Sequence, residues 1–341
     1  MTKIKMFCGK TAKVSNEAYE YAPGYVFTYD AACSDYDWLV VYDEMSAQRV
    51  GTLQGGYEPL VCPKERTMLC TWEPTSIKNY SRAYTHQFGH LLTNRPAAAE
   101  CHPHYHLGRG YFFWFVGRRP EEVRATVIPP KTKLISATCS SKRMRHTQHD
   151  ARVRLMRSLT RDIPELEWFG RGVRPFVRKY EVLDPYKYHV VVENHVASHH
   201  WTEKLADAFL CECLPFYAGD PDIFEVFPRE SLIPIPIDDP RESVRIIRAA
   251  MAADEYSKRR EAVLEAKRLL LEKYNFWAQV ISVIEAEKDQ PVTPIDPARP
   301  YRIWNRKALR LRHPLALVED GVFHLKQALR GLWNGDKRRG A

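Results

Sequence analysis

Five polar residues near the middle of the chain have the spacing of a ligand site at the edge of a parallel sheet. Glu193 and Asn194 end a short apolar run, and Thr202, Glu203 and Lys204 stand at the start of a predicted helix. Helix N-termini at such an edge offer free backbone N–H groups to anions. We therefore expect a nucleotide or a phosphate group to bind here.

The residues around this stretch predict a strand, a polar loop, a helix and a second strand. Tyr188–Val192 is short and β-branched, which is typical of a strand buried on both faces of a parallel sheet. Thr202 is a suitable N-cap for a helix over 202–214 with an inward apolar stripe. The next strand begins at Pro215.

Two further charged residues are candidates for catalysis and for phosphate binding. Glu73 follows an apolar strand and is fixed by Pro74, at a sheet edge where general bases are often found. The alternative for Glu73 is a solvated loop carboxylate. Arg152, on a predicted helix near a sheet edge, could bind phosphate or simply face solvent.

Two groups of histidines leave alternatives open. Loop histidines near the predicted anion site could contact substrate or only make the loop polar; they are His195, His199 and His200. The second group consists of Cys101, His102, His104 and His106. These side chains could share a zinc ion. The alternative is that they face solvent, which is favoured by the lack of a second Cys/His cluster to complete a tetrahedral site.

Composition indicates a folded protein with reduced thiols. The 341 residues suffice for two domains, and 45% hydrophobic with 12% aromatic residues argue against disorder. The eight cysteines form no CxxC pair. The first residues do not resemble a secretion signal, and no apolar run is long enough to span a membrane. These features predict a cytoplasmic protein.

The net charge of +9 is concentrated at the C-terminal end. Residues 301–341 hold seven Arg and three Lys against three acidic residues, which is +7, so the first 300 residues carry only +2. A folded body without a basic stripe argues against a nucleic-acid-binding protein.

The alternation of strands and helices predicts two α/β domains followed by a tail. An N-terminal domain is expected over 1–130, with its boundary at Pro129-Pro130. A second domain is expected over 131–288. Residues 289–341 are predicted to form a Pro-rich linker and a basic amphipathic tail. The tail could attach to an anionic membrane surface or pack back on the first domain.

The predicted anion site resembles the donor-binding signature of the bacterial-type fucosyltransferases of glycosyltransferase family ten. That family reads Phe-Glu-Asn, then Tyr-x-Thr-Glu-Lys, then a Pro-x-x-x-Gly strand. The chain has Val192-Glu193-Asn194, His200-Trp201-Thr202-Glu203-Lys204 and Pro215-Phe216-Tyr217-Ala218-Gly219. Cys70-Thr71-Trp72-Glu73-Pro74 is similar to a second family motif, so the resemblance covers roughly residues 67–240.

The resemblance implies a fold and a reaction. The fold is α/β of the GT-B type, with two Rossmann-like domains facing across a cleft. The reaction is transfer of fucose from GDP-fucose, with inversion, to a hydroxyl of a glycan acceptor such as a GlcNAc-containing cell-surface or lipopolysaccharide glycan. It implies no metal and no other cofactor, and it suggests a protein lying peripherally on the inner face of the cytoplasmic membrane.

The resemblance also assigns roles to residues. Glu73 would remove the acceptor proton, and Arg152 and Lys204 would stabilise the departing diphosphate, at which Thr202 and its helix point. Glu203 would accept hydrogen bonds from the ribose, and Asn194 would hold the donor. Glu193 would orient the loop or contact fucose, and His200 departs from the family's tyrosine and touches the donor pocket.

Several alternatives accompany this interpretation. The same fold and mechanism could use a different nucleotide-sugar donor, or the α/β body could be a catalytically silent scaffold. Two short motifs carry less weight. Gly9-Lys10-Thr11 resembles the end of a P-loop but has Ile4 where glycine is required. Asp35-Tyr36-Asp37 has the DxD form of metal-dependent glycosyltransferases and is expected instead to form a turn before a strand.

Overall fold

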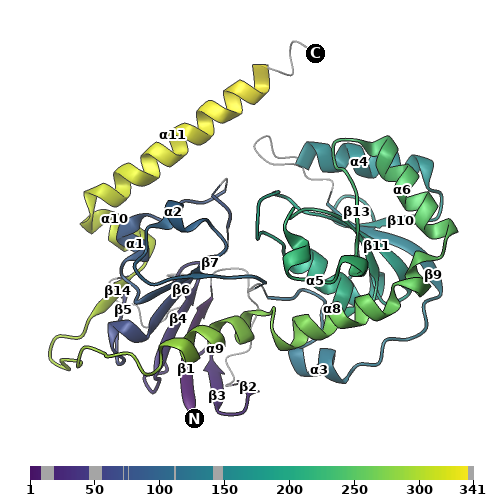
Figure 1. The fold of residues 1–341 in the computed structure, drawn as a ribbon. Helices are drawn as coiled ribbons and strands as arrows, with labels where there is room; N and C mark the ends of the chain where they lie inside the picture. The colour runs from purple at the N-terminus through teal and green to yellow at the C-terminus, as the bar shows by residue number, and fades with distance from the viewer. Residues whose placement is uncertain are drawn as a thin grey trace. The chain divides into compact units, whose positions relative to one another are not determined.

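The computed structural model describes residues 1–8, 19–45, 56–71, 73–75, 77–110, 113–140 and 149–336. The P-loop-like Gly9-Lys10-Thr11 and the motif residue Trp72 lie outside the described residues. The chain divides into two compact units (Figure 1). Unit 1 comprises Met1–Gly108 and Val280–Ala341, and unit 2 comprises Arg109–Gln279.

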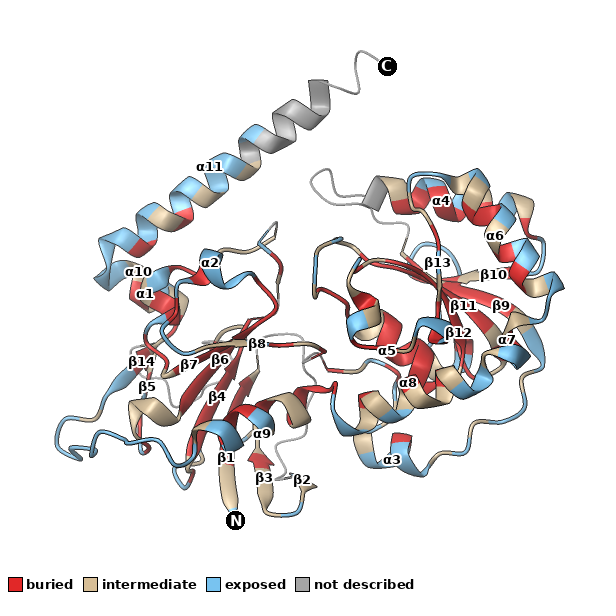
Figure 2. Cartoon of the chain, in the orientation of Figure 1, coloured by how far each residue is buried: buried red, intermediate tan, exposed pale blue. Residues whose placement is uncertain are grey.

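Unit 1 is built on a seven-stranded sheet in the order β2-β3-β1-β4-β6-β7-β8. Its pairings are parallel, except that β2 runs antiparallel to β3. The central strands are buried, as Figure 2 shows. The strands are β1 (Thr2–Cys8), β2 (Tyr19–Ala22), β3 (Tyr25–Thr28), β4 (Trp38–Tyr42), β6 (Thr67–Cys70), β7 (His90–Thr93) and β8 (Tyr105–Leu107).

Short helices and the C-terminal segment complete unit 1. A separate strand pair joins β5 (Tyr57–Pro59) to β14 (Arg302–Trp304). The helices are α1 (Arg82–Thr85), α2 (Ala97–Glu100), α10 (Arg306–Arg312) and α11 (Pro314–Asp336). Helix α9 (Phe276–Glu287) begins in unit 2 and ends in unit 1.

Unit 2 is built on a five-stranded parallel sheet in the order β10-β9-β11-β12-β13. The strands are β9 (Lys133–Thr138), β10 (Leu166–Phe169), β11 (Tyr186–Val192), β12 (Leu214–Ala218) and β13 (Ile233–Pro234). The helices are α3 (Pro120–Ala125), α4 (His149–Asp162), α5 (Glu203–Leu210), α6 (Pro240–Ala252), α7 (Glu255–Lys258) and α8 (Arg260–Glu272). One apolar core joins the sheet to α4, α5 and α8.

Two α/β units, each with a largely parallel sheet, confirm the predicted α/β class and its two Rossmann-like domains. Strand β11 lies between β9 and β12, and its residues from Tyr188 to Val192 are all buried. The apolar, β-branched character of this strand therefore follows from its central place in the sheet.

The structure divides the chain at positions other than the predicted 130 and 288. Residues 109–130 belong to unit 2, because Val116 and Val123 pack in its core and the Phe115 N–H donates to Asp207 Oδ1 at 3.0 Å. The second half of α9 and residues 289–341 belong to unit 1. The helix expected over 202–214 ends earlier, at Leu210, before Glu212 adopts a left-handed φ of 56°.

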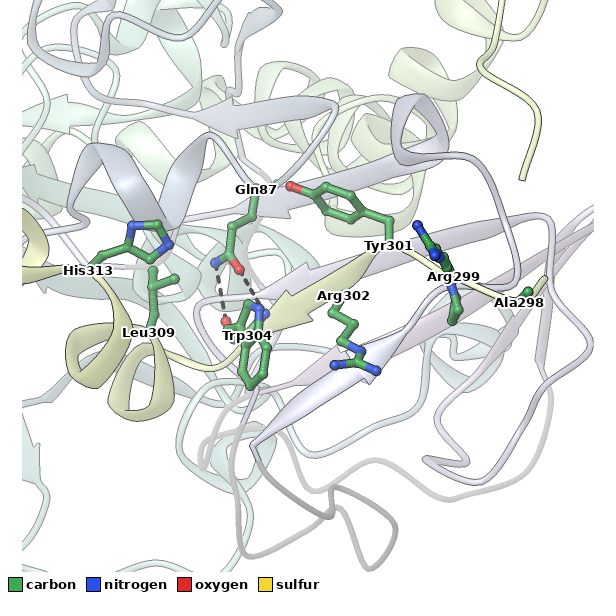
Figure 3. Close-up of a pocket in the computed structure, with 9 residues that line it drawn as sticks. Gln87, Ala298, Arg299, Tyr301, Arg302, Trp304, Leu309 and His313 are labelled. Carbon is green, nitrogen blue, oxygen red and sulfur yellow. Dashed lines mark hydrogen bonds between the residues drawn. The ribbon is translucent and has the colours of Figure 1, made fainter. Parts of the chain in front are cut away.

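Part of the predicted tail packs on unit 1. Gln87 and the backbone of Trp304 exchange two hydrogen bonds, of 2.8 and 3.2 Å (Figure 3). These residues help line a hollow of about 530 Å³ that includes Tyr301, Arg302 and His313, and none of the predicted site residues lines it. The packing alternative therefore holds for β14 and α10.

Helix α11 turns its acidic side toward the rest of unit 1. Glu319 accepts a hydrogen bond from the Arg82 N–H at 2.9 Å, and Asp320 accepts one from Asn79 at 3.1 Å. The opposite side of the helix exposes apolar residues, namely Leu315, Val318, Val322, Leu325 and Leu329. Within the described part of the chain, no helix has the length and hydropathy that a membrane span requires.

Candidate functional site

Glu193 fixes the loop after β11 to the start of α5. Its carboxylate is fully buried and accepts hydrogen bonds from the Thr202 N–H at 2.9 Å and the Thr202 hydroxyl at 2.8 and 2.9 Å. Lys204 Nζ lies 3.1 Å from the same carboxylate. Thr202 also caps α5, since its side chain accepts from the Lys204 N–H. Of the two expected roles of Glu193, the structure favours orienting the loop.

Lys204 lies between two carboxylates at the N-terminus of α5. Its Nζ is 3.1 Å from Glu193, 3.3 Å from Glu203 and 3.0 Å from the Thr202 hydroxyl. Burial lowers the pKa of Lys204, but the two carboxylates outweigh burial and leave this pKa raised. Burial raises the pKa of Glu203, but nearby positive charge, chiefly that of Lys204, outweighs burial and leaves this pKa lowered. Both side chains are therefore charged at neutral pH.

Arg152 is a buried cation whose hydrogen-bonding capacity is only partly used. It is 4% exposed, and its Nη1 donates to Asn194 Oδ1. Its Nε is buried without a hydrogen-bond partner, and among the described residues Arg152 forms no ion pair. Burial raises the pKa of the Cys139 thiol, while Arg152 and Lys204 both oppose that rise. The positive charges of Arg152 and Lys204 therefore both act on Cys139, which directly follows β9.

The loop between β11 and α5 is also tied to the end of β12. The backbone of His199 has a left-handed φ of 59°, and its N–H donates to Asp220 Oδ1 at 3.0 Å. Asp220 Oδ2 is buried without a partner. His200 is buried, and its ring lies 5.4 Å from that of His195. Sequence reasoning missed Asp220, although its position directly after the Pro-x-x-x-Gly strand was a usable signal.

Gly219 gives a prediction for the packing of this site. A Cβ at position 219 would lie 2.2 Å from the Tyr217 hydroxyl and 2.7 Å from Glu193 Cγ. We expect Gly219→Ala to lower the free energy of unfolding by about 2 kcal/mol, measured by urea denaturation. Gly321→Ala is the matched control, because nothing lies within 4 Å of its Cβ. Equal stability of Gly219→Ala and the wild type would contradict the packing described.

Glu73 follows β6 in unit 1, and buried side chains hold its backbone. Its carbonyl oxygen accepts from Arg95 Nε at 3.1 Å and Nη2 at 2.7 Å, and its N–H donates to the Tyr80 hydroxyl at 3.3 Å. Arg95 is in turn paired with Glu100 at 3.2 Å. Glu73 itself is half-buried, unlike a freely solvated loop carboxylate. No motif or periodic pattern in the sequence indicated these supporting residues.

The predicted site residues thus fall into two sets. Unit 2 holds the seven predicted donor-binding residues, which lie on α4, on α5 and between β11 and α5; they are Arg152, Glu193, Asn194, His200, Thr202, Glu203 and Lys204. Arg152 contacts Asn194, and Glu193, Thr202, Glu203 and Lys204 form one group of contacts. Figure 1 shows the elements that carry them. Glu73 belongs to unit 1. The DxD residues lie directly before β4, with a bend at Asp37 instead of the expected turn, and they hold structural partners: Asp37 accepts from the Lys3 N–H and Asp35 pairs with the Lys3 side chain.

Comparisons with known proteins gave structural similarities at low identity. No protein-family model and no curated protein matches the sequence. An α1,3-fucosyltransferase solved with GDP-fucose has a TM-score of 0.49 and 13% identity, over 80% of this chain and 90% of that chain. A trehalose-6-phosphate synthase, OtsA, has a TM-score of 0.46 and 10% identity, over 75% and 73%. Sucrose-phosphate synthase from Thermosynechococcus elongatus has a TM-score of 0.43 and 11% identity, over 83% and 88%.

Proposed function

We propose that the protein is an inverting glycosyltransferase that transfers fucose from GDP-fucose to a hydroxyl group of a glycan acceptor. The observation that carries this proposal is the buried Arg152 guanidinium, whose Nε has no hydrogen-bond partner and whose Nη1 donates to Asn194, next in the chain to the Glu193 that pairs with Lys204. Two fixed cations and a helix N-terminus suit a diphosphate. The sequence motif around Glu193 and Lys204 supports a GDP-sugar as the ligand that carries this diphosphate.

We propose the following chemistry. Glu73 accepts the proton of the acceptor hydroxyl while that oxygen bonds to the anomeric carbon of the donor sugar. The bond from that carbon to the phosphate oxygen breaks, and GDP leaves with the electron pair. Arg152 and Lys204 neutralise the charge that develops on the diphosphate, so the step needs no divalent cation.

Donor binding has to rearrange the contacts of Lys204. Three acceptors, Glu193, Glu203 and the Thr202 hydroxyl, already match the three protons of its ammonium group. The contact with Glu203, at 3.3 Å, is the longest of the three. We propose that the diphosphate takes the place of Glu203 on Lys204, and that Glu203 then accepts hydrogen bonds from the ribose hydroxyls.

The alternative function keeps this mechanism but uses a different nucleotide-sugar. A thermal-shift panel of GDP, UDP and CMP, each alone and with its sugars, distinguishes the two. The proposal predicts stabilisation by GDP and GDP-fucose but not by UDP or CMP compounds. Stabilisation by UDP-sugars alone favours the alternative donor, and no shift with any nucleotide contradicts glycosyl transfer.

We also propose that the protein lies peripherally on an anionic membrane through α11, at the cytoplasmic face. The apolar stripe from Leu315 to Leu329 is exposed, with Leu315 at 75%, and Lys326 lies exposed on the same helix. The acidic residues Glu319 and Asp320 are turned to unit 1, which removes their repulsion from an anionic surface. An apolar face flanked by positive charge is typical of interfacial helices.

Substitution of the stripe tests this attachment. Leu325→Glu is expected to reduce sedimentation with phosphatidylserine-containing liposomes by at least about tenfold, because it places a charge in the apolar face. His324→Glu adds the same charge at a neighbouring exposed position outside that stripe and is the matched control. Equal sedimentation of Leu325→Glu and the control would remove α11 from membrane binding.

A further inference from the structure

Three metal-binding side chains converge in unit 1, on elements that are far apart in the sequence. His90 lies on β7, His106 on the neighbouring strand β8, and Glu287 ends α9. Their ligand atoms all lie within 4.8 Å of one another. His90 Nδ1 is 3.2 Å from His106 Nε2, and His106 Nε2 is 3.9 Å from Glu287 Oε1.

A hydrogen bond to the backbone fixes the orientation of the His90 ring. Its Nε2 lies 2.8 Å from the backbone carbonyl oxygen of Glu65, which can only accept a hydrogen bond. His90 Nε2 therefore carries the proton, and Nδ1 presents a lone pair toward His106 and Glu287. The ring is buried and packs against Trp38 at 5.6 Å. A histidine held by a backbone carbonyl on its far nitrogen is the usual arrangement of a metal ligand.

The spacing and the ligand types suit zinc. Two nitrogens bound tetrahedrally to zinc at about 2.0–2.1 Å lie roughly 3.3 Å apart, and the observed separation is 3.2 Å. Two imidazoles with one carboxylate favour Zn²⁺ over Mg²⁺ and Ca²⁺, which prefer oxygen ligands alone.

We propose that His90, His106 and Glu287 bind one Zn²⁺ ion, which fixes the last turn of α9 to the sheet of unit 1. A cavity of about 570 Å³ borders the site, lined among others by His90, Glu287 and His86. A water molecule from this cavity supplies the fourth ligand. None of the proposed donor-binding residues, nor Glu73, takes part, so the ion stands apart from the proposed transfer reaction.

Metal analysis of the full chain tests the proposal. After treatment with a chelator, titration with ZnCl₂ under calorimetry is expected to load one ion per chain and to raise the melting temperature. Co²⁺ in place of zinc is expected to give the intense visible absorption of a tetrahedral site. Failure of the wild-type chain to take up either ion would overturn the proposal.

Variants locate the ion. His106→Gln and Glu287→Gln are expected to weaken zinc binding by at least about 100-fold, since each removes a ligand. Two controls are expected to keep wild-type affinity: His86→Gln, which changes a histidine of the same cavity, and Glu285→Gln, which lies on the same helix. Circular dichroism verifies folding, and the near-isosteric Glu287→Gln keeps the test decisive if His106→Gln does not fold. Unchanged zinc affinity in the folded ligand variants, or equal losses in the controls, would exclude this site.

Discussion

Glu73→Gln is expected to lower the rate of sugar transfer by about 10³-fold while leaving the affinity for GDP unchanged. The amide keeps the size of the side chain but cannot accept the acceptor proton, and general bases contribute roughly 10² to 10⁴ to a rate. The supporting contacts of Arg95 and Tyr80 go to the backbone of Glu73, so the substitution leaves them in place. The measurement is GDP release from GDP-fucose in the presence of acceptor, with GDP binding followed by calorimetry.

Glu44→Gln is the matched control for this experiment. Glu44 is a partly exposed carboxylate of unit 1 and lies 3.3 Å from Lys78, near the same end of the sheet. Its replacement is expected to leave the transfer rate within about twofold of the wild type, since Glu44 pairs with Lys78 and Arg306 and has no role in the proposed reaction. Full activity of Glu73→Gln would remove Glu73 from the role of base.

Lys204→Met is expected to have two separable effects. It removes a cation from the proposed diphosphate site, which should weaken GDP binding by about 100-fold. It also leaves Glu193 fully buried without its cation, which should cost about 3 kcal/mol of the free energy of unfolding. Calorimetry measures the first effect, and urea denaturation the second.

The double variant Glu193→Gln/Lys204→Met separates ligand binding from folding. Removing the buried charge should restore most of the lost stability, because the amide oxygen can still accept from Thr202. GDP affinity should remain low, since the phosphate still lacks its cation. Recovery of GDP binding together with stability would show that Lys204 acts only by neutralising Glu193.

Local patterns made most of the sheet edge predictable from the sequence. Tyr188–Val192 has the composition of a buried parallel strand, and Thr202 has the side chain of an N-cap, and both occur as predicted. The burial of Glu193 was not evident, because a glutamate at a strand end is equally compatible with solvent. Its burial depends on Thr202 and Lys204, which reach it only once α5 has packed on the sheet.

Contacts between distant segments could not be predicted in the same way. Arg95, which follows β7, donates hydrogen bonds to the carbonyl oxygen of Glu73. His90 lies close to Glu287, which is at the end of a helix far along the chain. Neither pairing leaves a periodic signal in the sequence. The division of the chain was misplaced for a related reason. Pro129-Pro130 marks a local break, whereas Val116 and Val123 join unit 2 through tertiary packing.

Hydrogen–deuterium exchange with and without GDP tests most directly whether unit 2 binds the nucleotide where we propose. The proposal predicts slower exchange on GDP binding in peptides that cover α4 and residues 193–210, because Arg152, Asn194 and Lys204 contact the ligand there. Peptides of β7 and β8 serve as the internal reference and should not change. Protection elsewhere, or no protection with saturating GDP, would contradict a donor site at the end of β11.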